Sequence, residues 1–394
     1  MEYSNIKEKR ERLGLTQKEF ADALGMGRNG DRTLRRWENG ESYPSMLEYK
    51  SIMDFPENPP FIFKGTPRFT MIDLFAGIGG IRLAFQKYGG LSVFASEWDK
   101  FAAKTYKMNY GEEPVGDITQ VPVSQIPEHN ILLGGFPCQP FSQAGLKKGF
   151  EDTRGTLFFD VARILKERKP QAFLLENVKQ LRGHDKGRTL ETILNVLRED
   201  LDYTVYVDVL RAADFGVPQN RERIYIVGFY NPLGGQSIPF KFPKPTNKPT
   251  RLGDILDENV NEKYTISDKL YQGHLRRKQE HKEKGNGFGF SLFNSDSPYA
   301  NTISARYYKD GSEILIDQGP NKNPRKLTPR ECARLQGFPK EFVITVSDTQ
   351  AYRQFGNSVA VPVVEMIAHN MIDAIENSVG FQYSTNHQEL ALNK

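Results

Sequence analysis

Cysteine and tryptophan are the scarcest residues of this 394-residue chain, with two of each. The two cysteines, Cys138 and Cys332, are too few for a disulfide framework and lack the clustered spacing of a zinc site. The six histidines are scattered along the chain, so no metal ion is predicted. This cysteine usage favours a reducing, cytoplasmic location.

Long apolar runs are also lacking. No stretch approaches the roughly 20 residues of a membrane span, and the first ten residues are too polar and charged for a secretory signal. Hydrophobic residues make up 38% and charged residues 26%, which is typical of a globular protein without a membrane partner. The formal net charge of +4 is too small to indicate a nucleic-acid partner by itself.

The composition changes along the chain and predicts a series of segments. They are a helical domain at 1–53, a proline-rich linker at 54–68, the main part of a catalytic domain at 69–235, a smaller domain at 236–345, the last part of the catalytic domain at 346–380 and a polar tail at 381–394.

Between residues 69 and 230, apolar segments alternate with segments of helical spacing. We expect strands at 69–75, 91–96, 130–134, 172–175, 203–210 and 223–229, with helices at 80–88, 98–108, 156–167 and 190–201. This alternation predicts an α/β domain, a Rossmann-like, mixed but mostly parallel sheet with helices on both faces.

A glycine-rich turn at 73–80 follows the first expected strand. Glycines let the chain turn sharply and let a ligand approach the backbone. Glu97 ends the next strand at a spacing that suits hydrogen bonds from ribose hydroxyls, and Trp98 offers a face for an adenine ring. Arg82 stands where a dinucleotide site needs a third small residue, which favours a nucleoside without phosphates. The alternative is a tight strand–helix turn without a ligand.

Cys138 lies between Pro137 and Pro140, on a loop after an apolar strand that ends in two glycines. Open α/β sheets bind ligands at the carboxyl ends of their strands, which favours a nucleophile over a small buried hydrophobe. Glu176 ends a later strand in the same way and predicts an acid beside the nucleophile. A solvated carboxylate at a strand end is the alternative.

Arg221 and Arg223 alternate by two, so they share a face on an extended chain. Two guanidinium groups on one face can clamp an anion or the polar edge of a base. A surface ion-pair ladder with Glu222 is the alternative. Asp117 lies in a Gly-Asp pair that suits either an adenine amino group or an ordinary turn.

Eight motifs follow one another in a characteristic order: DLFAGIGG (73–80), SEWD (96–99), GDI (116–118), GGFPCQPFS (134–142), ENV (176–178), QNRER (219–223), PRECARLQGFP (329–339) and GNSVAVPV (356–363). Together they resemble the bacterial DNA cytosine-5 methyltransferases of restriction–modification systems. The resemblance extends over residues 69–375.

The resemblance implies an enzyme that transfers a methyl group from S-adenosylmethionine to carbon 5 of a cytosine flipped out of duplex DNA. Cys138 would attack carbon 6 and Glu176 would hold or protonate ring nitrogen 3. Arg223 would contact the carbonyl oxygen of the base, and Arg221 would support the loop and a phosphate. No metal is required. The implied cofactor-binding residues are Phe75, Ala76, Gly77, Gly79, Gly80, Glu97, Trp98, Asp117, Ile118, Pro137, Asn357 and Ser358.

Residues 236–326 occupy the place of the target-recognition region and are similar to that of Dcm-like enzymes, which favours a CC-GG-like site. The basic stretch 269–284 supports phosphate attraction there. Implied DNA-contacting residues of the catalytic loop and of this region are Gln139, Ser142 and Thr302. Cys332, at helical spacing in its motif, is interpreted as a packing residue.

Residues 15–40 resemble the Xre/Cro-type helix-turn-helix, with Thr16 and Glu19 forming a capping box. The second helix would present Arg28, Arg32, Arg35 and Arg36 to DNA. The turn at 26–31 is about three residues longer than usual, and the charge of the region is nearly balanced. We expect a dimer that binds promoter DNA; docking to a protein is the alternative.

Three functions compete at this point. The first is an active DNA methyltransferase with an added regulatory domain, the second a transcription regulator with an inactive methyltransferase body, and the third an RNA cytosine methyltransferase. The complete set of Cys138, Glu176 and Arg223 favours an active enzyme. The helix-turn-helix and the long recognition region favour DNA.

Overall fold

The structure is a computed structural model that describes residues 4–27, 29–137, 157–231, 237–246, 248–286 and 289–378. By its internal contacts the chain divides into two compact units, each assembled from segments that are distant in sequence. The first unit comprises residues 1–62, 101–113 and 251–358, and the second comprises 63–100, 114–250 and 359–394.

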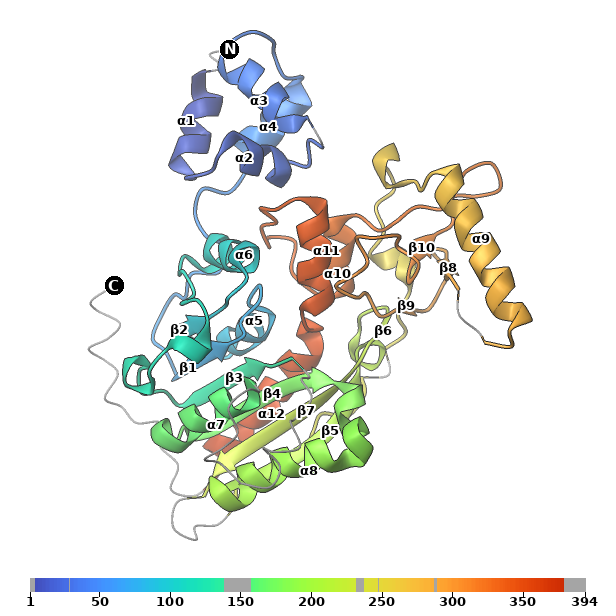
Figure 1. Ribbon diagram of the computed structural model, residues 1–394. Helices are drawn as coiled ribbons and strands as arrows, with labels where there is room; N and C mark the ends of the chain where they lie inside the picture. The colour runs from blue at the N-terminus through green and yellow to red at the C-terminus, as the bar shows by residue number, and fades with distance from the viewer. Residues whose placement is uncertain are drawn as a thin grey trace. The chain divides into compact units, whose positions relative to one another are not determined.

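A six-stranded sheet forms the centre of the second unit (Figure 1). Its strands, in spatial order, are β2 (Gly90–Ser96), β1 (Phe69–Leu74), β3 (Ile131–Gly135), β4 (Ala172–Val178), β7 (Glu222–Tyr230) and β5 (Tyr203–Arg211). Strands β1 to β4 pair in parallel, whereas β7 runs antiparallel to β4 and β5. The short strand β6 (Gln219–Asn220) precedes β7. The predicted mixed, mostly parallel α/β sheet is confirmed.

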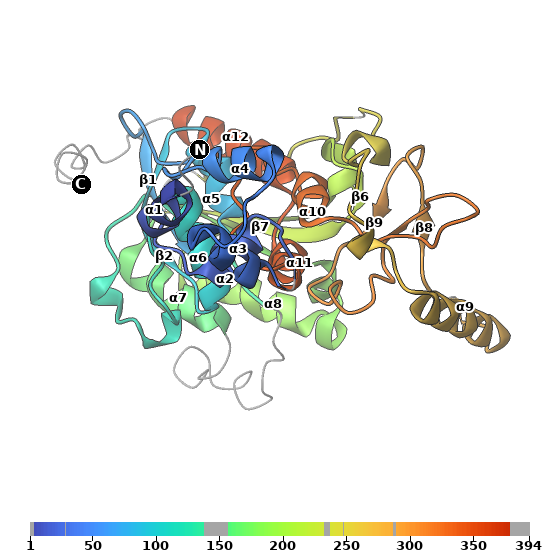
Figure 2. The same cartoon turned by 90° about the horizontal axis from the view of Figure 1, so that it is seen from above.

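Helices cover both faces of this sheet, as Figure 2 shows with α12 on one side and α7 and α8 on the other. They are α5 (Gly80–Gln86), α7 (Leu157–Arg168), α8 (Arg188–Asn195) and α12 (Val361–Glu376). A π-helical turn, Val196–Asp200, continues α8, so the expected helix at 190–201 is present but changes its winding. Helix α12 packs against α5, and Lys87 pairs with Glu365 at 2.8 Å.

Apolar runs in the central strands account for the core of the second unit. Every residue of β1 is buried, as are Ala172, Phe173, Leu174 and Leu175 of β4, because a parallel sheet covered on both faces has no solvated side. Gly228 of β7 lies opposite Phe173, and a methyl group there would come within 2.2 Å of that ring. The glycine therefore makes room for the largest side chain of the neighbouring strand.

Four helices form the N-terminal part of the first unit: α1 (Ser4–Arg12), α2 (Gln17–Ala23), α3 (Gly30–Glu38) and α4 (Met46–Met53). The predicted capping box of Thr16 and Glu19 is present. The Glu38 carboxylate accepts hydrogen bonds from Arg10 at 2.6 Å and from Gln17 at 2.8 Å, which joins α3 to α1 and α2. Helix α3 begins only at Gly30, so the turn after α2 is indeed long.

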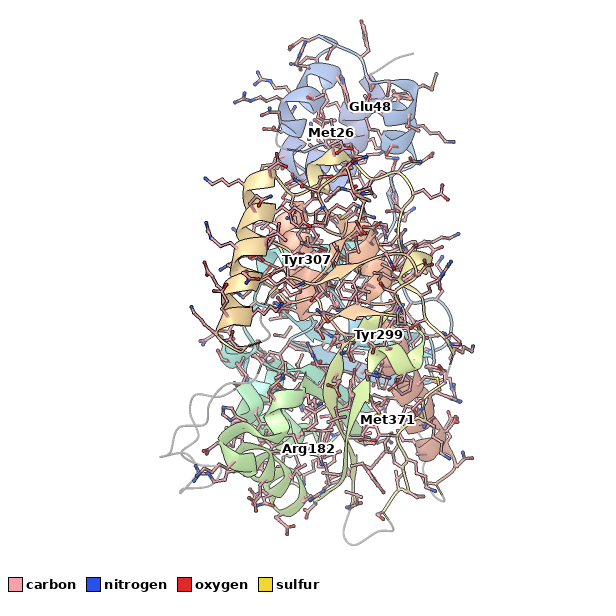
Figure 3. All side chains as sticks on the ribbon, turned by 90° about the vertical axis from the view of Figure 1, so that its right-hand side faces the viewer. Met26, Glu48, Arg182, Tyr299, Tyr307 and Met371 are labelled. Carbon is pink, nitrogen blue, oxygen red and sulfur yellow. The ribbon has the colours of Figure 1, made fainter. Side chains whose placement is uncertain are left out.

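The remainder of the first unit is less regular. It contains α6 (Lys100–Tyr110), α9 (Asp268–Glu283), α10 (Pro329–Leu335), α11 (Asp348–Asn357), β8 (Leu292–Phe293), β9 (Ala300–Asn301) and β10 (Leu315–Ile316). Cys332 is completely buried in α10, beside the buried Arg325–Glu331 ion pair, which agrees with a packing role. Tyr307, labelled in Figure 3, packs edge-on against Tyr352 of α11.

The helical stretch Asp348–Glu376, which includes α12, is long and apolar enough to cross a membrane by length and composition alone. However, 56% of its most apolar window is buried inside the structure, and the α12 side chains Val364, Ile367 and Met371 are completely buried. We therefore assign α12 to the core of the second unit.

Candidate active site

The polar residues of the sequence motifs lie at one edge of the six-stranded sheet, the edge formed by the ends of its strands. Strands β1, β2, β3 and β4 end at this edge, and the antiparallel β7 begins there. Because β2 and β3 lie on opposite sides of β1, the connections after β1 and β3 diverge at this point. Open α/β sheets form their ligand crevice where such connections diverge.

The turn after β1 has an unusual backbone. Phe75, Gly77 and Gly79 all have positive φ angles, of 54°, 57° and 80°. Glycine adopts this conformation without steric cost, but a phenylalanine in it is strained. Such strain within five residues of chain is typical of a ligand-binding turn, and Gly80 then begins α5.

Glu97 holds the turns after β1 and β2 together. One carboxylate oxygen accepts the Gly77 amide at 2.7 Å, and the other accepts the Asp99 amide at 2.7 Å. Burial raises the pKa of Glu97, while these hydrogen bonds oppose the shift. Trp98, the next residue, is 81% exposed, so its indole face is open for stacking.

Asp73 is a site residue whose role the sequence motifs did not reveal. It lies near the end of β1 and is 1% exposed, and neither carboxylate oxygen has a hydrogen-bond partner among the described residues. Burial raises the pKa of Asp73 well above its usual value, and the completely buried Arg82 opposes this shift. The signal was a carboxylate, the one charged residue of a strand that is buried on both faces.

Glu176 and the two arginines meet at the boundary of β4 and β7. Arg223 Nε lies 3.1 Å from Glu176 Oε1, with both side chains largely buried, and Arg221 is 2% exposed and acts electrostatically on the same carboxylate. Burial raises the pKa of Glu176, and the two arginines oppose that shift. Burial lowers the pKa of Arg221 to about 9, reinforced by the positive charge of Arg223.

Glu176 lies within β4 rather than beyond its end, because β4 continues to Val178. The strand was expected to stop at residue 175. The three extra residues pair with β7, with Glu176 opposite Tyr225 and Val178 opposite Arg223. The carboxylate is therefore held by a rigid ladder, and the solvated strand-end alternative does not apply to a residue that is 8% exposed.

Asn177 connects the same strand to the loop after β3. Its side-chain amide donates to the Phe136 carbonyl at 2.8 Å, and its side-chain oxygen accepts the Val178 amide at 2.8 Å. Asn177 is 2% exposed, so this is a buried link between β4 and the residue before Pro137. The ENV motif contains Asn177, but the sequence alone gave this residue no role.

A family model for "C-5 cytosine-specific DNA methylase" matches residues 69–373, most of the chain. The chain belongs to the C-5 cytosine-specific DNA methylases. A second family model, for a helix-turn-helix, matches residues 6–59.

Similar proteins cover almost the whole of this methylase. The chain is 63% identical to the type II methyltransferase M1.ScrFI of Lactococcus lactis subsp. cremoris over 95% of its length and 96% of that protein. It is 62% identical to the type II methyltransferase M.SsoII of Shigella sonnei over 95% of its length and 98% of that protein. Among solved structures, an Entamoeba histolytica methyltransferase has the same fold, with a TM-score of 0.63 at 22% identity, over 79% of this chain and 99% of that one.

The methylase places the remaining predicted residues as follows. Ala76 and Ile118 are buried. Asp117 is exposed, and its carboxylate accepts a hydrogen bond from the Thr119 amide at 3.0 Å. Pro137, which follows β3, is also exposed. Asn357 and Ser358 lie at the end of α11, and Thr302 is half-buried just after β9, all in the first unit. Arg32, Arg35 and Arg36 are exposed on α3. Cys138, Gln139, Ser142 and Arg28 lie outside the described residues.

Proposed function

We propose that this methylase transfers a methyl group from S-adenosylmethionine to carbon 5 of a flipped cytosine in duplex DNA. The observation that carries the proposal is the buried Glu176, paired with Arg223 at 3.1 Å on the sheet edge that Pro137 approaches. Its relatives are named type II methyltransferases, and we propose the corresponding role of protecting DNA against a restriction endonuclease.

Glu176 is suited to act on ring nitrogen 3 of the cytosine. Because burial raises its pKa, the carboxyl group holds a proton more readily than a solvated glutamate and can donate a hydrogen bond or the proton itself. Arg223 fixes one carboxylate oxygen, which leaves the other to meet the base. We assign Arg223 also to the carbonyl oxygen of the base and Arg221 to support of the loop and of a phosphate.

Cys138 is the proposed nucleophile. Its thiolate would add to carbon 6 of the base while Glu176 protonates ring nitrogen 3 or donates a hydrogen bond to it. This addition makes carbon 5 electron-rich. After methyl transfer, the proton on carbon 5 would leave to a base and the bond to Cys138 would break, restoring the aromatic ring. The cytosine must leave the duplex to reach this site, at a cost of a few kcal/mol.

The turn after β1 and its neighbours fit S-adenosylmethionine. The buried Asp73 carboxylate, which has no hydrogen-bond partner among the described residues, suits the cofactor's ammonium group. Glu97 suits the ribose hydroxyls and the exposed Trp98 suits the adenine. When bound, the cofactor supplies an electrophilic methyl group. We assign to the same site Phe75, Ala76, Gly77, Gly79, Gly80, Asp117, Ile118, Pro137, Asn357 and Ser358.

Methyl transfer from labelled cofactor to duplex DNA of varied sequence tests this proposal. We expect incorporation, and bisulfite sequencing should then show protected cytosines at one recurring site. A CC-GG-like site, read by residues 236–345 together with Gln139, Ser142 and Thr302, is our expectation. The absence of transfer to any duplex would contradict the proposal.

We further propose that the N-terminal helices bind promoter DNA as a dimer and regulate transcription. Arg32, Arg35 and Arg36 are exposed on α3, and none has an ion-pair partner within the part of the chain that the structure describes. Met46 and Leu47, at 65% and 78% exposure, offer an apolar surface for a second copy.

Footprinting of the full chain on DNA upstream of its own gene tests the regulatory role. We expect protection of a two-fold symmetric site by the wild type. An Arg35→Gln, Arg36→Gln double variant should lose the footprint yet retain methyl transfer. The regulatory proposal fails if the double variant still protects the site.

A further inference from the structure

A cluster of three positive charges around Tyr308 is not part of the active site described above. Arg306 and Lys309 lie on the loop after β9, and Arg353 lies on α11. The Arg353 guanidinium sits 4.7 Å from the centre of the Tyr308 ring and donates a hydrogen bond to its hydroxyl at 3.3 Å. All four residues belong to the first unit.

The cluster is held by a buried framework directly beneath it. Tyr307 and Tyr352, the chain neighbours of Tyr308 and Arg353, are both buried and pack edge-to-face with ring centres 5.1 Å apart. The Tyr307 hydroxyl donates to the Ile314 carbonyl at 2.6 Å and accepts the Leu327 amide at 2.8 Å. The buried tyrosine pair therefore fixes the positions of the half-buried Tyr308 and the exposed Arg353.

Gly356 of α11 provides a second, independent anchor. A methyl group at this position would come within 2.3 Å of the Ala305 amide nitrogen, so only glycine permits the loop backbone to approach the helix so closely. The loop after β9 thus packs against α11 at Tyr352 and at Gly356, which lie before and after Arg353 in the helix. A cluster that is positioned in this way loses little side-chain and backbone entropy when it binds a ligand.

The positive charges of the cluster have no ion-pair partner in the described part of the chain. The nearby carboxylates are engaged elsewhere: Asp310 pairs with Arg277 at 3.3 Å, and Asp348 pairs with Lys263 at 2.9 Å. The hydrogen bond from Arg353 lowers the pKa of Tyr308, and the charges of Arg353, Lys309 and Arg306 add to this effect. The local field is therefore positive and uncompensated.

We propose that Arg306, Lys309 and Arg353, arranged around Tyr308, bind the sugar–phosphate backbone of the duplex DNA that the enzyme methylates. Phosphate oxygens supply the negative charge that the cluster lacks, and Arg, Lys and Tyr side chains all donate hydrogen bonds to them. The proposal rests on the proposed function, because it names an interaction with that same substrate. Such interactions fix the register of the protein on DNA without reading its sequence.

The salt dependence of DNA binding measures these interactions directly. Removing one cation that neutralises a phosphate reduces the steepness with which log K falls against log salt by about 0.9. We would measure binding of the full chain to a short fluorescent duplex between about 50 and 200 mM salt. The variants Arg306→Gln, Lys309→Gln and Arg353→Gln should each lower the slope by about one and weaken binding on all sequences alike.

Two further variants serve as controls. Arg353→Lys keeps the positive charge and should retain the slope. Lys107→Gln removes an exposed cation of the first unit that lies outside residues 236–345 and already has a carboxylate partner in Glu113 at 2.7 Å, and it should also leave the slope unchanged. Repeating the series on an Arg35→Gln, Arg36→Gln background separates this interaction from any made by α3.

The outcomes separate this inference from the proposed function. If all three glutamine variants retain the wild-type slope while the wild type methylates DNA, the inference is wrong and the proposed function stands. A cluster that binds an acidic protein surface instead of DNA would give this result. If the wild type does not methylate any duplex but the slopes fall, the proposed function is wrong and the phosphate interaction stands.

Discussion

Arg223 Nε and Glu176 Oε1 lie 3.1 Å apart across two antiparallel strands, with side-chain exposures of 14% and 10%. In the register of β4 and β7, Glu176 faces Tyr225 and Arg223 faces Val178, so the ion pair crosses the strand pair diagonally. Burial raises the pKa of Glu176 while the arginine opposes this shift. The pair joins a group that can hold a proton to a rigidly positioned cation.

Glu176→Gln should lower kcat by about 10² to 10⁴, because the amide keeps the shape of the side chain but cannot transfer a proton to ring nitrogen 3. Cofactor affinity should change little. Glu222→Gln is the matched control, since its carboxylate is 40% exposed and pairs with Lys179 at the surface. Single-turnover methyl transfer by both variants checks the expectation, and full turnover by Glu176→Gln would refute the assigned role.

Asn177→Ala should change the reactivity of Cys138. The substitution removes the buried hydrogen bond to the Phe136 carbonyl, two residues before the cysteine, and small displacements of a reacting group can lower a rate by about 10². The alkylation rate of Cys138 by iodoacetamide, measured by peptide mass spectrometry, should differ from that of the wild type.

Cys332 is an internal reference for this experiment because it is completely buried and burial raises its thiol pKa. Asn231→Ala, which removes the hydrogen bonds between Asn231 and Thr204, is the matched control. Equal Cys138 alkylation and equal kcat in Asn177→Ala and the wild type would show that Asn177 does not position the loop.

Asp73→Asn should change both the pH dependence of stability and cofactor binding. The folded-state pKa of Asp73 is raised by burial, so its favourable contribution is complete below the unfolded value near 3.8 and is lost as pH rises through the folded value. The unfolding free energy of the wild type should therefore fall relative to that of Asp73→Asn as pH rises.

Binding of S-adenosylmethionine should weaken in Asp73→Asn, because the neutral amide cannot pair with the ammonium group. Urea unfolding at a series of pH values and calorimetric titration of the cofactor provide the two measurements. Asp117→Asn, at an exposed position, should leave the pH dependence unchanged. If the unfolding free energy of the wild type rises relative to that of Asp73→Asn as pH increases, our account of Asp73 is wrong.

Glu38→Gln should destabilise the N-terminal helices by about 3 kcal/mol. The Glu38 side chain is 2% exposed and pairs with Arg10, whose cation would be left in a partly buried place. Glu41→Gln, at an exposed carboxylate that accepts from Asn39, should have almost no effect. Limited proteolysis across residues 1–62 would report the difference, and equal cleavage rates would contradict the role assigned to Glu38.

Most of the sheet could be predicted from local patterns. The apolar runs of β1, β3 and β4 are continuous because both faces of the sheet are covered, and their starts agree with prediction to within one residue. The extension of β4 to Val178 could not be predicted, since Glu176 and Asn177 are polar and only their pairing with β7 places them in the strand. Tertiary pairing there outweighs local propensity.

The candidate site was predictable in its residue types but not in its electrostatics. Glycine spacing indicated the turn after β1, whereas the strained Phe75 and the buried Asp73 depend on packing that the sequence does not display. Arg82 was interpreted only as a departure from a dinucleotide motif. In the structure it is completely buried and acts electrostatically on Asp73, so its charge offsets part of the cost of burying the carboxylate beside the turn.

The most direct test of the central claim is a covalent trap at Cys138. Once bisulfite sequencing has located the methylated cytosine, a duplex carrying 5-fluorocytosine at that position is incubated with the enzyme and S-adenosylmethionine. Fluorine cannot leave as a proton does, so the bond between the cysteine sulfur and carbon 6 should persist. We predict a stable protein–DNA adduct that maps to Cys138 and is absent in Cys138→Ala. An adduct at another residue, or normal methyl transfer by Cys138→Ala, would contradict the account.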